Sequence, residues 1–178
     1  MFKKMIYVFL LLLIPLCVFP ISWEIKTDVG IIIELSDVTR DCDYLNQIME
    51  RDYKYIEAKI YNGNPNVNFY FFPPGSKSLF IDKNDETFRH KDIYFEFVNK
   101  LPGEKITQYQ DVIDKLSAIN LGYKESAKIL LVFSKDFDFF DARIFKIEFG
   151  SGLCVEYYRK DKAIVIIDEY NKLNLEEE

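Results

Sequence analysis

The sequence predicts an α+β domain with a largely antiparallel sheet and two main helices packed on one face. Several short segments alternate apolar and polar residues with the period of a strand, and two longer segments repeat apolar residues at helical spacing. The last third of the chain is typical of a three-stranded meander. A hydrophobic helix, either a signal or an anchor, is expected to precede this domain.

That N-terminal segment is an apolar run over residues 5–21, with Lys3 and Lys4 before it. As a helix it would be roughly 25 Å long, which is short for a bilayer span and long for the core of a cleaved signal peptide. Residues 1–22 are therefore either a signal peptide or a membrane anchor. In both cases the positive-inside rule places residue 23 onward outside the cytoplasm. The domain would stay membrane-anchored if the segment is retained, and would be periplasmic or secreted if it is cleaved.

Cys17 follows Leu13-Ile14-Pro15-Leu16 and resembles a bacterial lipoprotein acceptor box. Leu16, however, stands where a small residue is expected before a lipidated cysteine. An ordinary apolar cysteine is the favoured interpretation, and lipidation of Cys17 is the alternative.

Residues 23–175 have the length of a single domain, and residues 176–178 form an acidic tail. Without Lys3 and Lys4 the chain keeps 21 basic residues against 29 acidic ones, a net charge of −8. This charge argues against nucleic acid and against an anionic membrane surface as partners.

The first half of the domain is expected to begin with a strand over residues 29–35. A helix follows, capped by Ser36 or Thr39 and extending to Ile60, with Cys42 on its buried stripe. The next strand covers residues 67–72, and residues 79–81 return beside it after a Pro-Pro-Gly turn.

The second half begins with a polar segment and a predicted strand over residues 93–98. Thr107 and Gln110 form a capping box for the second helix, which Gly122 ends. Residues 128–133 are apolar without alternation, which predicts a strand covered on both faces.

The meander is predicted from its turns. A three-residue loop at 150–152 places Phe149 opposite Leu153 and Lys146 opposite Glu156. The segment 163–168 then forms the third strand of the meander. Its residues are apolar on both faces of the strand, which predicts a position inside the sheet.

His90 is the only histidine, and Cys154 is the candidate nucleophile that it could activate in a Cys/His hydrolase. Cys154 lacks a local catalytic motif and lies within a predicted strand. His90 lies between Arg89 and Lys91, which predicts a surface residue. No catalytic or cofactor site is therefore expected, and a non-enzymatic protein is favoured.

Two loops gather oxygen ligands, namely Asp82, Asn84 and Glu86 in one and Asp136, Asp138 and Asp141 in the other. The first resembles the start of a calcium loop but has Thr87 in place of the required glycine and Ile93 in place of the twelfth-position acid. The second is interleaved with phenylalanines. Solvated loop charges are the favoured interpretation, and no metal is expected.

The chain has aromatic clusters in segments predicted as alternating strands, so some of these rings cannot face the core; Tyr70, Phe72 and Tyr94 are among them. We expect a helix to cover them, with an exposed partner-binding patch as the alternative.

Cys42 and Cys154 form an even pair in an oxidising compartment, which makes a disulfide between them possible. The prediction requires that the first helix cover the face of the sheet toward which Cys154 points. Two reduced thiols are the alternative.

These features favour a membrane-anchored or exported non-enzymatic domain that binds a protein partner or contributes to envelope assembly. An immunity-type protein that neutralises a toxin is the alternative, and the Cys/His hydrolase is a second one.

Overall fold

The computed structural model describes residues 22–66, 68–71, 78–149 and 153–168. Over these residues the chain is a mixed α+β domain with two antiparallel sheets, a two-stranded ribbon and three short α-helices. The apolar run at 5–21 and the tail at 176–178 lie outside the described residues. Within the described part of the chain, no helix combines the length and the apolar character that a membrane span needs.

A four-stranded sheet has the order β1-β2-β3-β8, with β1 (Ser22–Lys26), β2 (Ile31–Asp37), β3 (Tyr53–Asn62) and β8 (Ser126–Ser134). A five-stranded sheet has the order β11-β10-β9-β5-β6, with β5 (Leu79–Asp82), β6 (Thr87–Arg89), β9 (Ala142–Glu148), β10 (Leu153–Tyr158) and β11 (Ala163–Asp168). The ribbon pairs β4 (Phe69–Phe71) with β7 (Ile119–Leu121). The helices are α2 (Asp43–Met49), α3 (Tyr94–Lys100), α4 (Gln110–Leu116) and the 3-10 turns η2 (Gly103–Lys105) and η3 (Thr107–Tyr109).

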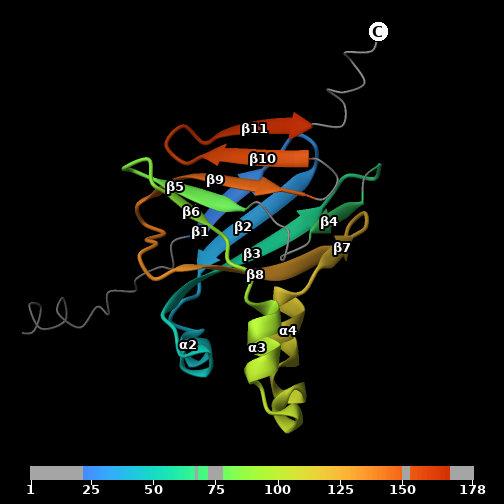
Figure 1. The fold of residues 1–178 in the computed structure, drawn as a ribbon. Helices are drawn as coiled ribbons and strands as arrows, with labels where there is room; N and C mark the ends of the chain where they lie inside the picture. The colour runs from blue at the N-terminus through green and yellow to red at the C-terminus, as the bar shows by residue number, and fades with distance from the viewer. Residues whose placement is uncertain (1–21, 67, 72–77, 150–152, 169–178) are drawn as a thin grey trace, which may run out of the picture.

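The two sheets pack face to face, and the helices form a third layer on the outer side of the four-stranded sheet (Figure 1). On the inner face of the four-stranded sheet, Ile33 and Ala58 belong to one apolar core with Phe80 and Phe145 of the five-stranded sheet. On the outer face, Tyr55 and Val132 pack against the helices in a second core. Burial of both faces makes the four-stranded sheet the middle layer.

The sequence predictions for β8 and for the meander are confirmed. Residues 129–133 of β8 are all buried, alternately against the five-stranded sheet and against the helices. The Phe149 N–H donates to the Leu153 carbonyl at 2.8 Å, and β9 and β10 keep the predicted register. Lys146 and Glu156 lie opposite each other and form an ion pair at 2.6 Å. The loop at 150–152 lies outside the described residues.

Three features of the predicted sheet are wrong. The strands form two packed sheets and not one, and β11 is an edge strand of the five-stranded sheet, where Val165 is 42% exposed. The strand β5 does not return beside β4. It pairs with β6 and β9, while β4 pairs with β7.

The predicted helix up to Ile60 is also wrong beyond Met49. Helix α2 ends there, Glu50 adopts a left-handed conformation with φ of 55°, and residues 53–62 form β3. Ile56 and Ile60 are four residues apart, which suits a helical face and also the same face of a strand. Pairing with β2 on one side and β8 on the other determines the outcome.

The segment predicted as a strand at 93–98 is instead helix α3. Phe97 is buried within α3, the flanking residues Ile93 and Leu101 are buried four positions before and after it, and Phe95 is 67% exposed. The second predicted helix is present but shorter, because η3 precedes α4 and α4 ends at Leu116. The predicted capping box does not form at its start, and the Gln110 amide donates to Asp114 instead.

Candidate functional site

An open groove of about 600 Å³ lies between the segment after β2 and the loop from β8 to β9. Arg40 and Asp41 line one wall, and Lys135 and Asp136 line the other. Lys54 of β3 also lines the groove and is half-buried. The lining therefore combines both charges, as is common where a protein surface meets another protein.

The loop from β8 to β9 carries three phenylalanines, and its fold determines where each one points. The Asp138 carboxylate accepts a hydrogen bond from the Phe140 N–H at 2.8 Å, and the Asp141 N–H donates to the Asp138 carbonyl at 3.2 Å. This turn buries Phe137 and Phe139 in the core. It leaves Phe140 on the groove with 55% of its surface exposed.

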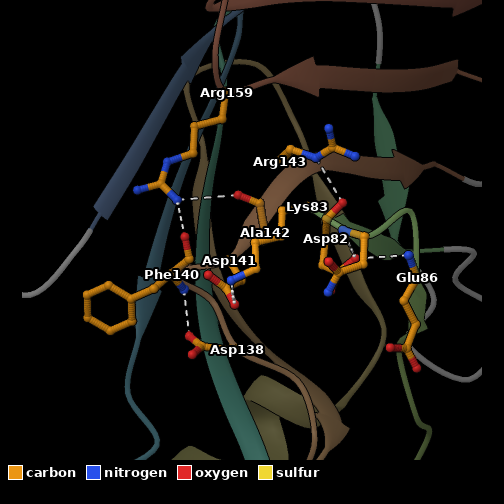
Figure 2. Close-up of polar contacts among 10 residues, drawn as sticks. Asp82, Lys83, Glu86, Asp138, Phe140, Asp141, Ala142, Arg143 and Arg159 are labelled. Atoms are coloured by element: carbon orange, nitrogen blue, oxygen red, sulfur yellow. Dashed lines mark hydrogen bonds and ion pairs between the residues drawn. The ribbon is translucent and has the colours of Figure 1, made fainter.

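Arg159, after β10, holds this loop against the sandwich (Figure 2). Its guanidinium donates to the Phe140 carbonyl at 2.7 Å and to the Ala142 carbonyl at 3.3 Å. The same group lies 5.2 Å from the centre of the Trp23 ring, a cation–π distance. Arg159 therefore connects the loop of the exposed phenylalanine to the first strand.

A second set of contacts fixes the other side of the loop. Lys83 forms an ion pair with Asp141 at 2.7 Å, and the Lys83 N–H donates to the Asp141 carbonyl at 3.1 Å. The Arg143 Nε donates to the Asp82 carbonyl at 2.9 Å (Figure 2). Arg143 also pairs with Asp85 at 2.6 Å. The loop is thus joined to the β5–β6 turn by both side chains and backbone.

The loop at Asp82 is a turn held by its own hydrogen bonds. The Asp82 carboxylate accepts from the backbone N–H groups of Asn84 and Glu86 at 2.8 and 2.9 Å. Burial alone would raise the pKa of Asp82, but these bonds and the charge of Arg143 outweigh it and lower the pKa. Among the described residues, no group of three or more His, Cys, Asp or Glu side chains could hold a metal ion.

The structure does not bring His90 and Cys154 together. Cys154 lies in β10 and His90 directly follows β6, and β9 and β5 lie between these strands. Three strand spacings correspond to about 14 Å, which is far beyond hydrogen-bond reach. His90 is also not a surface residue, because its imidazole is largely buried beside β8.

The predicted bridge between Cys42 and Cys154 is not formed, since Cys42 is a free thiol. Cys42 packs against the core on the helix side, whereas Cys154 belongs to the five-stranded sheet on the other side of the middle layer. The predicted helical cover for the face of Cys154 is therefore wrong. Cys17 lies outside the described residues.

The predicted aromatic residues have different surroundings. Tyr94 packs against the core between the helices and the four-stranded sheet, while Tyr70 is 44% exposed on the ribbon. Phe72 lies outside the described residues.

Sequence reasoning missed the groove-lining charges Arg40, Asp41, Lys54 and Lys135, and it missed Arg159, which holds the groove loop. The sequence did carry one signal for Lys54. If its segment is a strand, Tyr53 and Tyr55 face the helices, and Lys54 between them faces the opposite side. Arg159 follows the last residue of β10 and carries no local signal of its contacts.

Comparisons with protein-family models, curated proteins and solved structures find no significant match to this chain.

Proposed function

We propose that the chain is a membrane-anchored or exported, non-enzymatic domain that binds a protein partner through the groove at Phe140. The observation that carries the proposal is the position of Phe140, an exposed aromatic ring on a loop held by Arg159 and by the Lys83–Asp141 ion pair. A loop already held in place loses little conformational freedom on binding. Exposed aromatic rings at the centre of such surfaces supply much of the binding energy.

The groove's charges support a protein partner over a small apolar ligand. Arg40, Lys54 and Lys135 form no ion pair with other described residues, and they lie beside aspartates on the same lining. A partner surface with both charges could complement them and would bind in one orientation.

A photo-crosslinking amino acid at position 140 of the full chain, expressed in its native cells, tests this proposal. The matched control carries the same group at Phe95, which is exposed on α3 and does not line the groove. We expect a discrete protein adduct at position 140 and a much weaker one at position 95. Equal adducts at both positions, or none at position 140, would contradict the groove as the binding site.

The identity of the adduct separates the candidate functions. An envelope protein would support a role in envelope assembly, and a toxin domain would support the immunity-type alternative. A reporter fused after Glu178 tests the location independently: alkaline phosphatase should be active there, and activity of a cytoplasmic reporter would contradict it.

A further inference from the structure

The segment that follows β6 joins the two sheets. The His90 N–H donates to the Ser78 carbonyl, next to β5 of the five-stranded sheet, at 2.9 Å. The Lys91 N–H donates to the Val132 carbonyl of β8 at 2.8 Å. Because β8 is an edge strand of the four-stranded sheet, this segment covers part of its open edge. We call these four residues the His90 seam.

The imidazole completes the seam. The Val132 N–H donates to His90 Nδ1 at 3.1 Å, so the ring nitrogen takes the place of a strand carbonyl. An accepting Nδ1 carries no proton, which puts the proton of the neutral ring on Nε2. Nε2 is buried and has no hydrogen-bond partner among the described residues. The seam therefore requires the neutral ring in a single tautomer.

The charged ring does not fit this site. A proton on Nδ1 would face the Val132 N–H and remove the hydrogen bond. The Phe133 ring lies against the imidazole with ring centres 6.3 Å apart, and among the charged groups only the Asp92 carboxylate acts on the ring, favouring its charged form. Burial outweighs Asp92 and lowers the pKa of His90 to about 4.

We propose that the His90 seam is an acid-sensitive contact between the two sheets, which opens when the imidazole is protonated and uncovers the edge of β8. The inference does not depend on the proposed function. Val132 lies two residues before the end of β8, where the groove loop begins, so opening would occur beside the groove.

The direction in which pH shifts the opening of the seam follows from the pKa of His90 in the closed form and in the opened form. In the closed seam the pKa of His90 is about 4, and in an opened segment it returns toward 6.5. The closed form is therefore fully favoured above pH 6.5 and loses this preference as the pH falls toward 4. The opening equilibrium constant should rise on the order of 100-fold between pH 7 and pH 4.

Amide exchange of the purified full chain measures this opening, after correction for intrinsic exchange rates. We expect the amides of Lys91 and Val132 to lose protection over this pH range, while that of Ile33 in β2 changes much less. His90→Asn is the matched variant, since its side-chain oxygen can accept the Val132 bond but does not titrate. The variant should lose the pH dependence, and a dependence as large as that of the wild type would overturn the proposal.

The single histidine allows a direct test that needs no variant. In the ¹⁵N-labelled full chain, the imidazole should titrate well below pH 5.5 with Nδ1 unprotonated. A titration near 6.5, or a proton on Nδ1 at neutral pH, would overturn the proposal.

Discussion

Replacement of Arg159 by alanine should both destabilise the domain and release the groove loop. The guanidinium makes two hydrogen bonds to loop carbonyls, at 2.7 Å to Phe140 and 3.3 Å to Ala142, and it lies over the Trp23 ring. Alanine removes all three contacts but leaves the backbone bond from the Arg159 N–H to the Arg143 carbonyl.

The expected cost follows from these contacts. A charged donor on a carbonyl contributes about 1 to 2 kcal/mol when it is partly exposed, and the longer second bond adds less. The cation–π contact adds about 0.5 to 1 kcal/mol. Arg159→Ala should therefore lower the free energy of unfolding by about 2 kcal/mol. Arg159→Lys keeps the charge but loses the planar fork, and should cost about half as much.

Urea unfolding of the full chain measures these differences, provided that the slope with denaturant is unchanged. Arg89→Ala is the control, because the Arg89 side chain is exposed and forms no ion pair or hydrogen bond with the described residues. It should change the free energy by less than about 0.5 kcal/mol. A cost below this value for Arg159→Ala would refute the role assigned to Arg159.

Three further predictions concern the core, a thiol and an ion-pair network. Phe80→Ala removes a fully buried ring and should cost about 3 to 5 kcal/mol in urea unfolding, whereas Phe95→Ala should change stability by less than about 0.5 kcal/mol. Burial raises the pKa of the Cys42 thiol to about 11, so its alkylation, followed by mass spectrometry, should accelerate steadily up to pH 10 and not level off near pH 9. Burial would raise the pKa of Glu57, but hydrogen bonds from Lys128 and Lys115 lower it overall. The stability difference between the wild type and Glu57→Gln should therefore be present above pH 4.5 and shrink as the pH falls, and a difference that grows in acid would be inconsistent with it.

The meander could be predicted because two independent constraints agree there. The loop length fixes which residues lie opposite each other, and the alternation fixes which face each residue occupies. Both give the observed pairing of Lys146 with Glu156. In β3 the only constraint was a spacing of four between Ile56 and Ile60, which fits two structures equally well.

His90 shows how one missed strand hides a buried residue. Its charged neighbours suggested a surface loop, but Phe88 is buried, Arg89 is exposed and His90 is partly buried again. This is the alternation of a strand edge, and it becomes visible only once β6 is recognised. The short length of β6 left no pattern long enough to identify it from sequence.

The groove could not be predicted, because its residues meet only through the sheet topology. Lys54 of β3 lies opposite Phe133 of β8, so the pairing of these distant strands brings Lys54 beside the loop that follows β8. Neither segment carries a motif that indicates the other. The local pattern did identify the phenylalanines of that loop, but the turn at Asp138 and the contact from Arg159 determine which of them lies outside the core.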